Sequence, residues 1–178
     1  MLAPHRSPAC GGNATAVGEG REIVIDLQAP VLRPFCILEV EIGPVLSVGA
    51  GRFGQRRIIP IIGGRVSGSR VSGTIISGGA DWQTICQDGV ADLSARYAFE
   101  TDDGAIIEIV NEGYRHAPDE VNRRIAAGES VTPDAYYMRT TARLETGHPA
   151  YNWVNRMVFV GTGAKSPSGV QIDLFSVE

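Results

Sequence analysis

The stretch of this sequence best suited to chemistry is an aspartate set between a glycine pair and a tryptophan, Gly78-Gly79-Ala80-Asp81-Trp82-Gln83. Glycines allow backbone conformations and close approaches that other side chains block. Beside a large aromatic ring the Asp81 carboxylate could be poorly solvated, which would raise its pKa and suit it to proton transfer near neutral pH. The same residues also fit a tight entry into a strand, with Asp81 bonded to nearby backbone amides.

A second segment, 136–145, could supply groups that act together with Asp81. Its alternation places Tyr137 and Arg139 on one face of a strand. A phenol and a guanidinium could stabilise an enolate or phenolate while Asp81 takes the proton, so we predict these three residues as the catalytic set. The alternative is a buried polar network in which Arg139 pairs with Asp81 or Glu145.

Further polar and aromatic side chains share faces that could look into the same cavity. The segment 93–101 carries an aromatic on its apolar face, and 105–111 carries an amide there, which must find a partner or a ligand if it is buried. In 151–159 the odd-numbered residues share one face of a predicted strand. The predicted substrate-binding residues are Trp82, Tyr97, Asn111, Trp153 and Asn155, although both tryptophans also fit as core residues.

Short alternating segments joined by turns must position these groups. The clearest is a hairpin in which Asp102-Asp103-Gly104 joins 93–101 to 105–111, since Asp-Gly is a strong hairpin signal. Segments 35–42 and 170–177 also alternate, and 118–127 is the one predicted helix, begun by Pro118 and ended by Gly128.

This patterning predicts an all-β fold, a single antiparallel β-barrel with an internal ligand cavity and one short helix. A β-sandwich is the alternative. Glycine accounts for 22 of the 178 residues and is spread along the chain, as turn-rich β domains require. We expect a flexible N-terminal extension over residues 1–30 and the barrel domain over 31–178, with the helix outside the barrel or at one end.

Composition and motifs disfavour several other classes. A net charge of −4 gives no electrostatic footprint for nucleic acid or for an anionic membrane, and no apolar run is long enough to span a bilayer. Three scattered cysteines and the lack of a signal-like N-terminus predict a cytoplasmic protein.

The match of 49–54 to GxGxxG runs into an apolar segment rather than a helix, so we expect no nucleotide there and only solvated arginines after it. His116 and His148 lack partners at ligand spacing, so we expect no metal and no cofactor.

In its motifs the chain resembles the domain-of-unknown-function family numbered 3237. The resemblance runs from about residue 35 to 177, with Met138 standing where the family more often has Phe and Val154 where it more often has Leu. It implies a β-barrel with a ligand-sized cavity, and members placed in natural-product pathways resemble cofactor-free catalysts of ring closure on phenolic polyketides. The matching pieces are 57–64 (RIIPIIGG), 78–83 (GGADWQ), 95–97 (ARY), 101–105 (TDDGA), 111–113 (NEG), 136–140 (YYMRT) and 151–156 (YNWVNR).

Two functions are therefore expected for this sequence. The first is a cofactor-independent acid–base enzyme, a cyclase, isomerase or lyase, that acts on a small aromatic, phenolic or carbonyl compound inside the barrel. The second is a barrel that binds a small molecule without catalysis. Only the first needs a titrating acid within reach of the ligand. A homodimer is compatible with either function.

Overall fold

The computed structural model describes residues 26–166 and 169–178 of the chain. Residues 1–25 of the predicted extension therefore lie outside the described part, and 26–31 have no regular secondary structure. The strands are β1 (Leu32–Ile42), β2 (Leu46–Gly51), β3 (Gly54–Ser67), β4 (Gly73–Ile75), β5 (Gly79–Cys86), β6 (Ala91–Thr101), β7 (Ile106–His116), β8 (Tyr137–Glu145), β9 (Val158–Ser166) and β10 (Gly169–Val177). The helices are α1 (Asp119–Ala126) and two 3-10 helices, η1 (Pro133–Ala135) and η2 (Asn152–Arg156).

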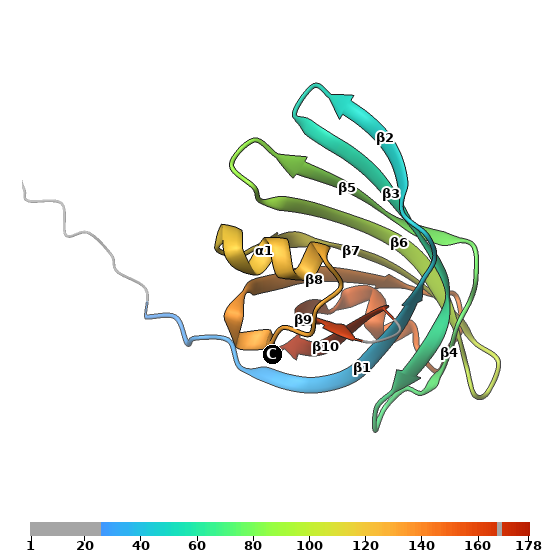
Figure 1. The fold of residues 1–178 in the computed structure, drawn as a ribbon. Helices are drawn as coiled ribbons and strands as arrows, with labels where there is room; N and C mark the ends of the chain where they lie inside the picture. Colours follow the sequence, from blue (N-terminus) through green and yellow to red (C-terminus); the bar gives the residue numbers. More distant parts are fainter. Residues whose placement is uncertain (1–25, 167–168) are drawn as a thin grey trace, which may run out of the picture.

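The strands form a closed antiparallel barrel, which confirms the predicted fold class (Figure 1). The order around the ring is β1-β10-β9-β8-β7-β6, and β3 closes it by pairing with β1. Both β4 and β5 pair with β6 on one side and with β3 on the other, one after the other along these strands, so together they fill one position of the ring. Because β2 pairs only with β3, the ring has eight strand positions. Closure leaves no long unpaired edge around the ring, and a barrel of this size can enclose one small ligand.

Residues 49–54, which match GxGxxG, form the turn of the hairpin of β2 and β3. Gly51 pairs with Gly54 across its turn, so the glycines serve a strand connection and do not open a helix. Figure 1 shows this hairpin continuing beyond the ring, because β2 pairs with the first half of β3 while β1 pairs with the second half. The predicted hairpin of 93–101 and 105–111 is likewise present as β6 and β7, joined at Asp102-Asp103-Gly104.

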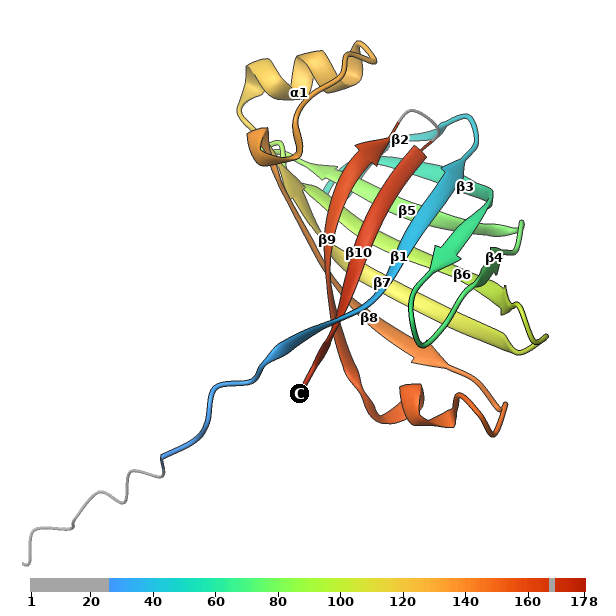
Figure 2. The same ribbon diagram turned by 90° about the horizontal axis from the view of Figure 1, so that it is seen from below.

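One end of the barrel is filled by an apolar core. Phe99, Ile107, Ile109 and Phe159 are fully buried there, and the connection between β8 and β9, which contains η2, covers that end. The other end carries α1, where Ile125 packs with Leu93 and Met138 in a second cluster. Figure 2 shows η2 and α1 at opposite ends of the barrel, so α1 lies at one end, as predicted.

Within the described residues, no helix is both long enough and apolar enough to cross a lipid bilayer.

Candidate active site

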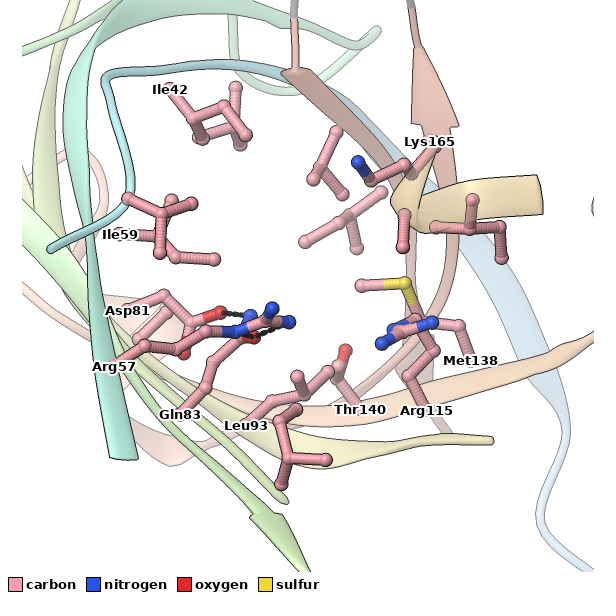
Figure 3. Close-up of a pocket in the computed structure, with 18 of the residues that line it drawn as sticks. Ile42, Arg57, Ile59, Asp81, Gln83, Leu93, Arg115, Met138, Thr140 and Lys165 are labelled. Carbon is pink, nitrogen blue, oxygen red and sulfur yellow. Dashed lines mark hydrogen bonds between the residues drawn. The ribbon is translucent and has the colours of Figure 1, made fainter. Parts of the chain in front are cut away.

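A cavity of about 860 Å³ lies inside the barrel and extends to α1 (Figure 3). This central cavity falls within the range of about 300–1,000 Å³ that is typical of small-molecule sites. Residues from β1, β3, β5, β6, β7, β8, β9 and β10 contribute to its wall. Most of its surface is aliphatic, with lining residues that include Val40, Ile42, Ile59, Ile61, Leu93 and Ile172.

Asp81 lies on this wall at the head of a three-residue hydrogen-bonded chain. Its Oδ2 accepts a hydrogen bond from Gln83 Nε2, and its Oδ1 accepts one from the backbone N–H of Ser94 at 3.0 Å. Gln83 Oε1 in turn accepts from Arg57 Nε at 2.9 Å and from Arg57 Nη2 at 2.7 Å. The amide of Gln83 therefore connects the carboxylate to a guanidinium, and all three side chains line the central cavity.

The two glycines ahead of Asp81 shape its strand. Gly78 has φ +118°, a conformation that L side chains rarely adopt, and it forms the turn into β5. A Cβ on Gly79 would lie 2.4 Å from the Cβ of Tyr97, so a glycine is needed for β5 to approach β6 this closely. The glycine pair therefore brings the Asp81 strand against Tyr97, which also lines the cavity.

Alternation along β5 sends Trp82 out of the barrel. Successive side chains of a strand point to opposite faces, so Asp81 and Gln83 face inward and Trp82 faces solvent, where it is 41% exposed. Trp82 therefore does not line the central cavity, contrary to its place in the predicted substrate-binding set. The apolar surroundings of the Asp81 carboxylate come from the barrel interior instead.

Burial raises the pKa of Asp81 above its ordinary value of 3.8. Hydrogen bonds from Gln83 and Ser94 and the charge of Arg57 oppose that rise, and the charge of Asp92 adds to it. For Arg57 burial lowers the pKa, and the charge of Asp81 opposes this. We expected solvated arginines after the GxGxxG match, but Arg57 is half-buried in the cavity wall.

Two more cations face the cavity from the opposite wall. Figure 3 shows Arg115 and Lys165 there, with Met138 between them, across from Asp81 and Arg57. Burial lowers the pKa of Arg115, and the charge of Arg57 lowers it further. Burial also lowers the pKa of Lys165, with added effects from Arg115 and Arg57. Sequence reasoning missed both residues.

Three buried polar side chains on successive strands complete the lining. The atoms Tyr97 Oη, Asn111 Oδ1 and Thr140 Oγ1 have no hydrogen-bond partner among the described residues, and all three residues line the cavity. We refer to Tyr97, Asn111 and Thr140 as the polar triad. Because buried polar atoms are nearly always paired, the triad is suited to hydrogen-bonding a ligand. Tyr97 and Asn111 were predicted as substrate-binding residues, and their position in the cavity is compatible with that role.

Tyr137 and Arg139 lie outside the barrel, contrary to the predicted catalytic set. On β8 the even-numbered residues Met138 and Thr140 face inward, so the odd-numbered ones face solvent. Tyr137 is 45% exposed and stacks on His116, and the Arg139 guanidinium lies 5.3 Å from the Tyr137 ring centroid. The pattern of β8 already pointed this way, because its even-numbered face carries uncharged side chains and its odd-numbered face carries Arg139, Arg143 and Glu145.

Trp153 and Asn155 lie at the filled end, away from the cavity. The predicted strand over 151–159 begins only at Val158, and 152–156 form η2. Trp153 packs edge-to-face on Phe35, with Arg70 3.6 Å from its ring centroid. Asn155 exchanges hydrogen bonds with the backbone of Thr146. These contacts tie the β8–β9 connection to the barrel, so neither residue lines the central cavity.

No group of three or more His, Cys, Asp or Glu side chains comes together as a metal-binding set in the part of the chain that the structure describes. The half-buried groups that converge on the cavity are the Asp81 carboxylate and the guanidiniums of Arg57 and Arg115, joined by the Lys165 ammonium and the polar triad, and the exposed Asp119 and Arg123 of α1 also line it. They can exchange a proton with a bound molecule and hydrogen-bond its oxygen atoms.

Related proteins share this chain's sequence and barrel. A UPF0311 protein of Rhodopseudomonas palustris is 45% identical over 140 residues, which cover 79% of this chain and 92% of that protein. A UPF0311 protein of Clostridium acetobutylicum is 43% identical over 134 residues, covering 75% and 85% of the two chains.

Solved structures show the same fold. The crystal structure of a conserved protein of unknown function from R. palustris matches with a TM-score of 0.80 at 40% identity, over 86% of this chain and all of the other. A β-barrel-like protein of Acinetobacter baumannii matches with a TM-score of 0.76 at 37% identity, over 86% and 99%. An enzyme from Penicillium herquei, with a TM-score of 0.67 at 20% identity over 88% and 100%, shares the fold.

The resemblance noted in the sequence is confirmed across the barrel domain. Residues 30–177 match the family described as "Protein of unknown function (DUF3237)", which covers nearly all of the described chain. The chain therefore belongs to this DUF3237 family.

Proposed function

We propose that this protein is a cofactor-independent acid–base enzyme that acts on a small aromatic phenol or carbonyl compound bound in the central cavity. The observation that carries the proposal is the placement of Asp81, a half-buried carboxylate in an otherwise mostly aliphatic cavity wall, with a pKa that burial raises. A carboxyl group whose pKa lies closer to neutrality is better matched to both taking and giving a proton.

The chemistry would begin with removal of a proton by Asp81. The C–H or O–H bond of the substrate breaks, its electron pair moves onto the substrate oxygen, and the proton forms the O–H bond of neutral Asp81. Return of that proton to another atom of the same molecule completes an isomerisation. Attack by the enolate carbon on a carbonyl carbon of the same molecule completes a ring closure, with the proton on Asp81 passing to the oxygen that becomes negative. Collapse of the enolate with departure of a leaving group, which takes the proton from Asp81, completes an elimination.

Neighbouring groups would stabilise the negative charge on that oxygen. Arg57 uses Nε and Nη2 to hold Gln83, which leaves Nη1 without a partner among the described residues. Tyr97 Oη and Thr140 Oγ1, the two hydroxyls of the polar triad, can donate hydrogen bonds to that oxygen. Preorganised donors in a cavity that excludes water are worth far more than the same donors in water. Figure 3 shows Asp81, Gln83 and Arg57 on the wall that would face the reacting atom.

A related fold also serves an enzyme. The Penicillium herquei protein described as an enzyme has the same barrel at 20% identity, which supports catalysis only as a possibility of the fold. The chemistry proposed above therefore depends on the residues of the cavity.

A proton-exchange experiment tests the proposal without the natural substrate. The probe is 1,3-dihydroxynaphthalene, a phenol whose ring protons exchange with solvent through a keto tautomer. In D₂O the protein should accelerate loss of these proton signals in NMR spectra. Asp81→Asn should slow that exchange by a factor of about 100 to 10,000 while the probe still binds. The matched control is Glu100→Gln, which removes an exposed carboxylate of β6 and should leave exchange unchanged.

One observation favours the second candidate, a binding protein without catalysis. Both Asp81 oxygens already accept hydrogen bonds within the protein, one of them from the Ser94 backbone, as a purely structural carboxylate would. That function predicts binding of the probe with no acceleration of exchange, and an Asp81→Asn variant that loses stability only. Acceleration that persists in the folded Asp81→Asn variant would also overturn the catalytic assignment.

A further inference from the structure

Three cationic side chains converge on the central cavity from two walls. Figure 3 shows the guanidinium groups of Arg57 and Arg115 directed into the cavity from opposite walls, with Lys165 on the same side as Arg115 and Met138 between them. The charges are close enough to affect one another, since the pKa of Lys165 is lowered by both arginines as well as by burial. Arg57 and Arg115 are half-buried and Lys165 is exposed, so solvent screens only part of the repulsion, and the convergence of three like charges on one cavity calls for an explanation.

The described residues provide little compensating negative charge. None of the three cations belongs to an ion pair in residues 26–166 and 169–178. The acids that line the cavity are Asp81, which is bonded to Gln83 and Ser94, and Asp119 on the exposed side of α1. A fourth lining cation, Arg123, pairs with Glu120. The cavity therefore has an excess of positive charge, although the whole chain carries a net charge of −4.

Free donor capacity remains on each of the three cations. Arg57 keeps Nη1, and Arg115 uses Nη1 for a hydrogen bond of 3.3 Å to Asn122 Oδ1, which leaves Nε and Nη2. No hydrogen bond from Lys165 Nζ to another described residue is present, although its backbone N–H donates to Tyr136 Oη. A guanidinium and an ammonium on one wall can together bind an oxyanion, and charge-assisted bonds of this kind are about twice as strong as neutral ones.

We propose that the central cavity selects an organic anion, a compound with an aromatic body and one carboxylate, and that Arg115 and Lys165 bind the carboxylate. The aliphatic wall would hold the body, so the cavity favours such a compound over a compact, strongly hydrated ion such as phosphate. This inference rests on the proposed function, because it names the substrate class of the same cavity. With the carboxylate bound at Arg115 and Lys165, the body extends across the cavity toward Asp81.

Binding of two probes of equal shape tests the charge preference. Isothermal titration calorimetry at pH 7 compares 2-naphthoate with neutral 2-naphthamide. The naphthoate should bind about 10- to 100-fold more tightly, the ratio expected for one to two charge-assisted hydrogen bonds. Arg115→Met and Lys165→Met should each remove most of that ratio by weakening naphthoate binding, with naphthamide binding changed by less than about twofold.

Two further variants control for charge and folding. Arg143→Met removes an exposed arginine of β8 and should leave the ratio unchanged, which separates local binding from a change in net charge. Arg115→Lys keeps a cation and should retain part of the preference. Lys165→Met relieves repulsion among the three cations, so its melting temperature should equal or exceed that of the wild type.

The results separate this inference from the proposed function. Naphthamide binding as tight as naphthoate binding, no binding of either probe, or an unchanged ratio in both Met variants would overturn anion selection. Anion selection without proton exchange on 1,3-dihydroxynaphthalene would support the present inference and reject the enzyme. Exchange that depends on Asp81, without any preference for naphthoate, would do the reverse.

Discussion

Asp81 and Arg57 lie on neighbouring strands of the cavity wall and share Gln83 as their common hydrogen-bond partner. The carboxylate accepts from the amide N–H, and the amide oxygen accepts from the guanidinium. Because Gln83 stands between them, the opposite charges do not form a direct ion pair. This relationship limits how far Arg57 lowers the pKa of Asp81, and burial prevails.

The pH dependence of stability should reveal this burial. Since burial raises the pKa of folded Asp81 above 3.8, the carboxyl group ionises at lower pH in the unfolded chain than in the folded one. Its contribution to stability is therefore complete below pH 3.8 and is lost as pH rises through the folded pKa. The free energy of unfolding of Asp81→Asn, relative to wild type, should increase over that interval. Denaturant unfolding of both proteins from about pH 3 to about pH 8 measures it.

A control variant separates this effect from the general charge balance. Glu100→Gln removes an exposed carboxylate on the same sheet, and the loss of stability attributed to Asp81 should remain in it. A stability difference between Asp81→Asn and wild type that does not vary with pH would show that the carboxyl group titrates alike in both states.

Removing the Tyr97 hydroxyl should not destabilise the free protein. That hydroxyl is buried and has no partner among the described residues, so Tyr97→Phe removes an unmade hydrogen bond and should raise the free energy of unfolding by up to about 1 kcal/mol. The matched variant Tyr136→Phe removes a hydroxyl that accepts from the Lys165 backbone N–H at 2.8 Å, and should cost about 1 kcal/mol. If Tyr97→Phe costs as much as Tyr136→Phe, the triad is not free to bind a ligand.

Outward-facing residues of β5 and β8 should be dispensable for proton exchange. Trp82→Phe, Tyr137→Phe and Arg139→Met alter side chains outside the cavity, so exchange on 1,3-dihydroxynaphthalene should stay within about twofold of wild type. Arg57→Met is the comparison, because it removes a guanidinium from the cavity wall and should slow exchange by about tenfold or more. A large loss in Arg139→Met would instead restore the catalytic set predicted from sequence.

The filled end of the barrel should affect stability without affecting the ligand. Trp153→Ala removes an edge-to-face contact with Phe35 and the stacking of Arg70, and should cost about 2–4 kcal/mol of unfolding free energy. The dissociation constant of 2-naphthoate for folded protein should not change, because Trp153 does not line the cavity. Arg70→Met should cost only about 0.5–1 kcal/mol, since it removes the cation alone. Weaker binding in folded Trp153→Ala would show that the two ends are coupled.

Local signals were sufficient for much of the architecture. The Asp-Gly turn between β6 and β7 required a hairpin because few other residues tolerate that backbone, and Gly104 has φ +87°. Period-two alternation in 35–42 identified a half-buried strand. The glycine pair at 78–79 indicated a turn and a close approach, whereas the sequence left open whether Asp81 faced a cavity or bonded to backbone amides, and in the structure it does both.

The composition of the cavity depended on tertiary structure. Arg115 lies four residues after Asn111 on β7, so extension of the same alternation would have placed both in the cavity. Lys165 follows two inward-facing glycines, which carry no hydrophobic signal, so the sequence did not show which face of its strand it shares. On β8 the even-numbered face is uncharged and the odd-numbered face carries Arg139, Arg143 and Glu145, so the pattern favoured the even face inward. Only the tertiary structure decided that Met138 and Thr140 meet the cavity whereas Ala142 and Leu144 join the filled core. In 151–159 the alternation is real, but Trp153 packs across Phe35 on a 3-10 turn. Sequence spacing determines which side chains share a face and which face is buried. Barrel closure determines which buried residues meet the cavity and which meet the core, because closure depends on pairings between distant strands.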